Sequence, residues 1–222
     1  MKTLVSLLLI IAFLYSCNTP GKKDANTNGY PRDTIYNDTS ILVTKITKDV
    51  FDHYDSADPY KDLVRTKLVK VVHDTLKLSI GNGASVIFTD TLTNTDNSEI
   101  RINHHFGNVL DYYAVQASFY ESSTFYLVNR VNGNKYEMVS EPLLSPGRKY
   151  IYANCGSLGY DEMPTEFQVW KIGKDKLTKK ADVDLGSKGI EIERIKMISD
   201  DTLAVRLMDG DGRCSYGVVV IK

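Results

Sequence analysis

The chain begins with an apolar run and then becomes strongly polar. Residues 4–14 are almost entirely apolar, Lys2 precedes them and Cys17 follows closely. This order predicts a secretory signal peptide over residues 1–16, because a spanning helix needs about 20 apolar residues. The stretch from residue 18 to about 38 is rich in Asn, Thr, Lys, Asp, Gly and Pro, so it has little apolar surface to bury. We expect residues 17–38 to form a disordered tether.

From residue 39 onward the pattern predicts a single β-rich domain, 39–222. Short runs of β-branched and aromatic residues alternate with Gly, Asn, Asp and Ser turns, which is typical of antiparallel β-structure. One short helix is expected within residues 45–67, where the pattern is mixed. The predicted strands are 68–72, 75–80, 85–89, 112–119, 124–128, 149–153, 167–172, 203–207 and 216–221.

A weak internal repeat changes the expected architecture of the second half. Leu144–Tyr150 reads Leu-Ser-Pro-Gly-Arg-Lys-Tyr, and Ile198–Leu203 reads Ile-Ser-Asp-Asp-Thr-Leu. Both segments resemble the Ser-Pro-Asp-Gly-Lys turn and inner strand of bacterial β-propellers of the TolB and WD-repeat kind. The resemblance covers about residues 112–222 and implies an antiparallel, propeller-like meander.

The length of the chain limits this propeller reading. Closed propellers use about four to eight four-stranded blades. At about 45 to 50 residues per blade, the mature chain has material for three or four. The propeller would therefore be incomplete or few-bladed, and a β-sandwich is the alternative.

The end of the signal peptide indicates how the chain is anchored. Leu14-Tyr15-Ser16-Cys17 resembles the lipobox of bacterial lipoproteins, which implies a diacylglycerol thioether on Cys17 and anchoring of the chain to a membrane by palmitate-type lipid. Lys22 and Lys23 follow, rather than the acidic cluster that resembles a surface-export signal. We therefore expect a cell-envelope lipoprotein on the periplasmic face of the outer membrane.

Charge and cysteine content narrow the partners. Lys and Arg total 27 against 28 Asp and Glu, with no long basic run, so a nucleic-acid partner is not expected. Once Cys17 carries lipid, only Cys155 and Cys214 remain. In an oxidising compartment these two cysteines form either a disulfide or a pair of buried thiols, and the sequence leaves both open.

The sequence carries no strong catalytic or metal-binding motif. His104 and His105 are adjacent, and neighbours on a strand point to opposite faces, so we predict no metal or other cofactor there. Asp209–Gly212 lacks the later ligands of a calcium loop and is read as a hairpin turn. We therefore predict no catalytic residues and interpret the domain as a non-catalytic module that binds a protein or glycan.

The alternative is an envelope hydrolase whose residues meet only in the folded chain. A pocket that contained His104, His105 and a carboxylate would favour this alternative. An exposed patch formed by the many aromatics of the second half would favour the binding module, although core packing also explains these aromatics.

Overall fold

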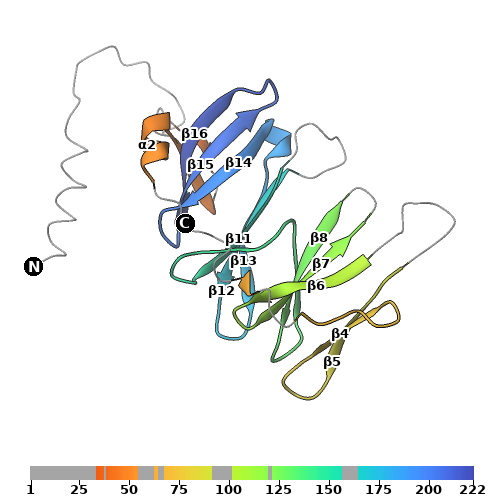
Figure 1. The fold of residues 1–222 in the computed structure, drawn as a ribbon. Helices are drawn as coiled ribbons and strands as arrows, with labels where there is room; N and C mark the ends of the chain where they lie inside the picture. Colours follow the sequence, from red (N-terminus) through yellow and green to blue (C-terminus); the bar gives the residue numbers. More distant parts are fainter. Residues whose placement is uncertain are drawn as a thin grey trace, which may run out of the picture. The chain divides into compact units, whose positions relative to one another are not determined.

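The structure, a computed structural model, describes residues 34–37, 39–54, 63–64, 68–91, 102–119, 122–156 and 165–222. In these ranges the chain folds mainly as antiparallel strands (Figure 1), which confirms the all-β prediction. The signal peptide, Cys17 and most of the predicted tether lie outside the described residues. None of the helices in the described part is long and apolar enough to cross a membrane.

The described strands form four antiparallel sheets. The hairpin sheet consists of β4 (Thr75–Ser79) and β5 (Ser85–Thr89). The β6–β9 sheet contains, in order, β3 (Leu63–Val64), β6 (Ile102–Val109), β7 (Tyr112–Ser118), β8 (Ser123–Asn129) and β9 (Lys135–Met138). The β10–β13 sheet contains β10 (Leu143–Leu144), β11 (Tyr150–Cys155), β12 (Glu166–Ile172) and β13 (Leu177–Asp184). The terminal sheet contains β14 (Ile190–Met197), β15 (Thr202–Asp209), β16 (Cys214–Ile221), β2 (Ile41–Ile46) and β1 (Thr34–Asn37).

Three hydrophobic clusters of described residues join these sheets in succession. Leu76 and Phe88 of the hairpin sheet pack with Val115 of β7. The β6–β9 and β10–β13 sheets share a second cluster, and the β10–β13 and terminal sheets share a third. The β10–β13 sheet is therefore covered on both faces, which explains why β11 and β12 are apolar at successive positions rather than alternate ones.

The terminal sheet brings together the two ends of the domain. Strand β16 pairs with β2 in antiparallel register, with Ile221 opposite Ile41. The helix α2 (Lys48–His53) packs beside this sheet through a ring contact between Phe51 and Tyr216, 5.2 Å between centroids. This helix lies in the window 45–67 where one was predicted. A 3-10 turn, η2 (Gly186–Lys188), precedes β14.

A buried lysine holds α2 at its C-terminal end. The Nζ of Lys196, on β14, donates to the backbone oxygens of Phe51 at 3.0 Å and Tyr54 at 2.8 Å. The last carbonyls of a helix have no partner within it, and a cation is favourable at that end. A six-residue helix is marginal by itself, so we attribute its stability to these tertiary contacts.

Two sequence predictions of local structure were wrong. Residues 34–37 were assigned to the disordered tether but form β1, because their backbone pairs with β2 and Ile35 packs against the core. Residues 68–72 were predicted as a strand but make only an isolated bridge, Val72 to Thr75. The structure also contains β6, β13 and β14, which were not predicted.

The two turns that carried the repeat are in direct contact. The Asp200 carboxylate accepts hydrogen bonds from Ser145 Oγ at 2.8 Å and Gly147 N at 2.6 Å, and Lys149 Nζ lies 3.1 Å away. The hydroxyl of Tyr152 donates to the backbone oxygen of Asp200. A Cβ at position 147 would lie 2.4 Å from Asp200 Oδ2, so any side chain there would displace the carboxylate from its hydrogen bonds. We call this contact between the β10–β13 and terminal sheets the Asp200 junction.

The electrostatics of the Asp200 junction favour the charged carboxylate. Burial opposes ionisation of Asp200, but the hydrogen bonds from Ser145, Lys149 and the Gly147 amide outweigh it and lower the pKa of this carboxyl. The Asp200 side chain is 15% exposed, whereas that of Lys149 is 71% exposed. The Ser145 and Gly147 bonds are therefore the energetically important ones.

Candidate functional site

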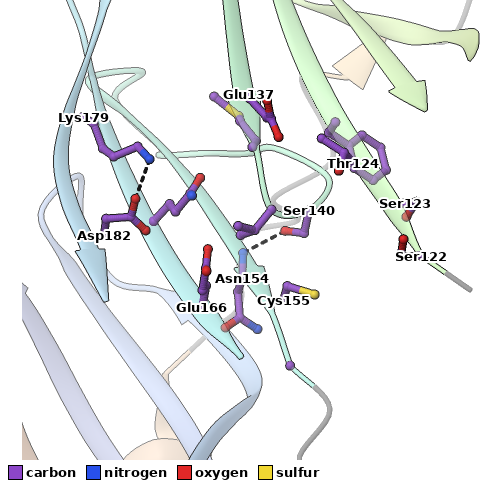
Figure 2. A pocket seen from close by; sticks show the side chains of 15 residues that line it. Ser122, Ser123, Thr124, Glu137, Ser140, Asn154, Cys155, Glu166, Lys179 and Asp182 are labelled. Atoms are coloured by element: carbon purple, nitrogen blue, oxygen red, sulfur yellow. Dashed lines mark hydrogen bonds and ion pairs between the residues drawn. The ribbon is translucent and has the colours of Figure 1, made fainter. Parts of the chain in front are cut away.

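A polar cleft lies between the β6–β9 sheet and the β10–β13 sheet (Figure 2). Its volume is about 820 Å³. The same two sheets share an apolar cluster containing Phe125, Met138 and Trp170, so the cleft is the polar part of this interface. The lining residues come from β8, β9, β11, β12 and β13 and from positions next to these strands, and the polar ones are Ser122, Ser123, Thr124, Glu137, Ser140, Asn154, Cys155, Glu166, Gln168, Lys179 and Asp182.

Strand pairing explains why several polar side chains share this face. Cys155 is opposite Glu166, and Gln168 is opposite Asp182. Residues directly opposite on antiparallel strands point to the same face. Glu166, Gln168 and Trp170 alternate along β12, so they project toward the β6–β9 sheet.

A β-bulge in β13 determines which charges reach the cleft. Val169 pairs with Ala181, and Trp170 pairs with Lys179, which leaves Lys180 as the extra residue. Without the bulge, Lys179 and Asp182 would point to opposite faces, since they are three residues apart. With it, both line the cleft and form an ion pair, as Figure 2 shows. Bulges often redirect side chains beside functional sites.

Gln168 is the most deeply buried polar side chain of the cleft. It is 4% exposed, and its Oε1 accepts a hydrogen bond from Trp170 Nε1 at 3.3 Å. Because an indole nitrogen only donates, the Gln168 oxygen must face Trp170. The amide nitrogen therefore remains available toward the cleft, and no described residue accepts a hydrogen bond from it.

Glu166 lies beside Cys155 at the end of the cleft where β11 ends and β12 begins. Burial raises the pKa of the Glu166 carboxyl, and the charge of Asp182 raises it further, while Lys179 only partly offsets this. No hydrogen bond or ion pair reaches this carboxylate from the part of the chain that the structure describes. The protein therefore places a carboxylate where its charge is disfavoured.

Cys155 has the environment of an inert thiol. Burial raises the pKa of Cys155, and the charges of Glu166 and Glu191 raise it further. A cysteine nucleophile requires a thiolate, which positive neighbours stabilise. The surroundings of Cys155 have the opposite sign, so they argue against nucleophilic chemistry.

The histidines do not meet in this cleft. His105 is 3% exposed, its Nδ1 accepts from the Val69 amide at 2.9 Å, and its ring contacts Tyr113 edge-on. Burial lowers the pKa of His105, with Arg130 contributing in the same direction. His104 contacts Phe106 on the same strand. Both histidines therefore make packing contacts outside the cleft. The cleft does not combine His104, His105 and a carboxylate, which was the arrangement that would favour a histidine-based hydrolase.

Of the remaining predicted candidates, Cys155 lines the cleft, whereas Cys214 and Asp209–Gly212 lie outside it. Cys155 and Cys214 are free thiols on β11 and β16, which belong to different sheets. A disulfide between them therefore stays a prediction. Asp209 accepts from the amides of Asp211 and Arg213 within the turn between β15 and β16. In the described ranges no cluster of three or more His, Cys, Asp or Glu side chains is placed to hold a metal ion.

The aromatics of the second half mostly belong to the core. Tyr112, Phe125, Tyr152 and Trp170 are buried in the hydrophobic clusters. They therefore do not supply the exposed aromatic patch that was considered as a binding surface.

The cleft residues Glu166, Gln168 and Asp182 were missed at the sequence level. The available signal was the Gln that interrupts the otherwise apolar run Phe167–Trp170 of a strand covered on both faces. This signal becomes informative only when both faces of the β10–β13 sheet are known to be covered by other sheets.

Comparisons with known proteins add no assignment. A scan against protein-family models and searches of curated proteins and of solved structures found no match. The functional argument therefore rests on the geometry of the cleft.

Proposed function

We propose that the chain is an outer-membrane lipoprotein, anchored through lipid on Cys17, whose β-domain binds a polar ligand in the cleft without catalysis. The cleft carries this proposal: it replaces apolar packing between two sheets with carboxylates, hydroxyls and the buried amide of Gln168. Several of these side chains, including Glu137 and Asp182, are exposed to solvent, whereas Gln168 is 4% exposed and a buried polar group is costly to leave without a partner. A ligand that accepts from the Gln168 amide accounts for the presence of this side chain.

A propeller-like, incomplete architecture is part of the same proposal. Successive sheets share hydrophobic clusters, and β2 from the start of the domain joins β14–β16 in one sheet. Left-handed residues also recur at the turns that precede β4, β7 and β11: His73, Leu110 and Arg148 have φ of 48°, 50° and 59°. Their regular recurrence supports a repeated unit that extends beyond the two turns read from the sequence.

The ligand site is tested by thermal-shift screening of the full chain in detergent. The probes are muropeptides and outer-membrane core oligosaccharides. We expect at least one probe to raise the Tm, because a ligand that binds only the folded state stabilises it. Gln168→Leu should abolish the shift, whereas Gln116→Leu on β7, outside the cleft, should retain it. The proposal fails if no probe raises the Tm, or if folded Gln168→Leu protein responds like the wild type.

The anchor is tested separately by metabolic labelling. Cys17→Ala should abolish palmitate incorporation and release the chain from the outer-membrane fraction, because no acyl chain can then be attached. Cys214→Ala is the matched control and should label normally. Undiminished labelling of Cys17→Ala would contradict the lipoprotein assignment.

A second candidate function is an envelope glycoside hydrolase. Glu166, whose pKa is raised by burial, has the character of a general acid, and Asp182 on the adjacent strand is held by Lys179. This candidate predicts hydrolysis of aryl glycosides that disappears in both Glu166→Gln and Asp182→Asn. If the wild type hydrolyses neither aryl hexosides nor aryl N-acetylhexosaminides, the hydrolase candidate is rejected and the binding module is retained.

A further inference from the structure

The charges of the cleft are unbalanced. Three carboxylates line it, from Glu137, Glu166 and Asp182, against one ammonium, from Lys179. Lys179 is already engaged, because it pairs with Asp182 and its Nζ lies 4.9 Å from the centroid of the Trp170 ring. No other lysine and no arginine is among the described residues that line the cleft. The electrostatic potential of the cleft is therefore negative. The Glu166 carboxylate forms no ion pair with a described residue.

A hydrogen-bond donor lies on the same strand as this carboxylate. Glu166 and Gln168 are two residues apart on β12 and share a face, so their Cα atoms are about 6.5 Å apart. The Gln168 amide nitrogen faces the cleft because its oxygen is committed to Trp170. The Gln168 residue is 4% exposed, and its amide nitrogen, which opens to the cleft, has no acceptor among the described residues, so a ligand oxygen can bind beside it.

We propose that the cleft recognises a small polar molecule carrying a primary ammonium, with the ammonium at Glu166 and an adjacent hydroxyl or carbonyl oxygen accepting from Gln168. This inference rests on the proposed function of the cleft and specifies the chemistry of its ligand. The ammonium donates to the carboxylate and replaces the missing cation, while the neighbouring oxygen satisfies the amide. An amino sugar and a lysine side chain with its backbone carbonyl both provide an ammonium, but only the amino sugar places an oxygen next to it.

The spacing of the two groups favours the amino sugar. In an amino sugar the ammonium and its nearest hydroxyl are on adjacent carbons, whereas in lysine the four-carbon side chain separates the ammonium from the backbone carbonyl. The hydroxyl groups of Ser123, Thr124 and Ser140 add further donors and acceptors around the cleft. We therefore expect the amino sugar to bind more tightly.

Isothermal titration calorimetry of the full chain in detergent tests the inference. The probes are fully de-N-acetylated chitobiose, its N,N′-diacetylated form, and Nα-acetyl-lysine amide. We expect the free-amine disaccharide to bind, the diacetylated form to bind at least about tenfold more weakly, and added salt to weaken binding. Tighter binding of the lysine amide than of the amino sugar would show that the ammonium belongs to a lysine side chain rather than to an amino sugar. The requirement for an ammonium would still hold.

Matched carboxylate variants locate the ammonium. Glu166→Gln is nearly isosteric and should weaken binding of the free-amine disaccharide by about tenfold or more. Asp49→Asn, on the exposed surface of α2, makes the same change of net charge and should leave binding unchanged. Circular dichroism and the Tm confirm that both variants are folded.

Two results would overturn the inference. Equal affinity for the free-amine and diacetylated forms would remove the ammonium requirement while leaving the cleft as a binding site. Absence of binding by every ammonium probe at millimolar concentration would reject the inference, and the muropeptide and oligosaccharide screen would then decide the proposed function by itself.

Discussion

The Asp200 junction gives the sharpest prediction about stability. Asp200→Ala removes the acceptor of the Ser145 hydroxyl at 2.8 Å and of the Gly147 amide at 2.6 Å, together with the Lys149 ion pair. A hydrogen bond to a charged group contributes about 1.5–3 kcal/mol, whereas an exposed ion pair contributes about 0–1 kcal/mol. Water recovers part of the loss at this partly exposed site, so we expect the free energy of unfolding to fall by about 2–4 kcal/mol.

Urea denaturation and calorimetry measure this loss. For a domain of this size, 1 kcal/mol corresponds to about 2–4 °C in Tm, so Asp200→Ala should lower the Tm by about 5–15 °C. Asp201→Ala is the matched control, because the Asp201 side chain bonds only to Ser199 and Thr202 beside it, and it should cost less than about 1 kcal/mol. The double variant Ser145→Ala/Asp200→Ala should lose less than the sum of the two single losses.

The pH dependence of the same variant gives an independent check. The folded-state pKa of Asp200 lies below the ordinary value of about 3.9, so the charged carboxylate is the stabilising form. Its contribution is complete above that ordinary value and is lost as the pH falls through the folded pKa. The difference between wild type and Asp200→Ala should therefore be constant from about pH 5 to 8 and shrink below about pH 4. A loss under 1 kcal/mol at pH 7, or one that grows in acid, would refute this reasoning.

Three further predictions follow from single residues. Glu166→Gln should raise the Tm at neutral pH, because the raised folded-state pKa of Glu166 makes its charged form destabilising. This gain in Tm should disappear as the pH falls through that pKa, and a lower Tm of the variant at pH 7 would contradict the prediction. Lys196→Met should lower the free energy of unfolding by about 1–3 kcal/mol and expose the α2 backbone amides to hydrogen exchange, because the helix loses its cation; unchanged exchange would contradict it. Iodoacetamide should alkylate the exposed Cys214 faster than Cys155, whose pKa is raised by burial. If neither cysteine is alkylated under non-reducing conditions, the two form a disulfide instead.

The parts of the fold that were predicted from sequence have strong local signals. β11 and β12 are dense in β-branched and aromatic residues, and the turns at Gly83 and Gly133 have the positive φ of 80° and 77° that glycine accommodates. The Ser-Pro-Gly repeat was also informative, because its two copies meet at the Asp200 junction.

The strands that were missed lack such signals. β6 contains five polar or glycine positions in its eight residues, and β13 begins with Leu-Thr-Lys-Lys, so neither stands out by composition. β14 reads Ile-Glu-Ile-Glu-Arg-Ile-Lys-Met, and its alternation is interrupted by a bulge between Ile192 and Arg194. Pairing with neighbouring strands, rather than local preference, determines these segments.

The cleft could not be derived from the sequence because its residues meet only in the folded chain. Ser123 and Asp182 come from different sheets and are 59 positions apart in the sequence. The bulge at Lys180, which turns Lys179 and Asp182 toward the same side, has no distinctive residue pattern. The adjacent histidines His104 and His105, for which no metal or cofactor was predicted, lie outside this cleft and make local packing contacts.

Chemical-shift mapping tests the central claim, that the cleft is the ligand site, most directly. Amide spectra of the full chain in detergent would be recorded during titration with de-N-acetylated chitobiose. The account predicts that the largest shifts fall on Ser123, Cys155, Gln168 and Asp182, around the cleft, and that Glu166→Gln suppresses them. Shifts centred on another surface, such as α2 or the hairpin sheet, would contradict it.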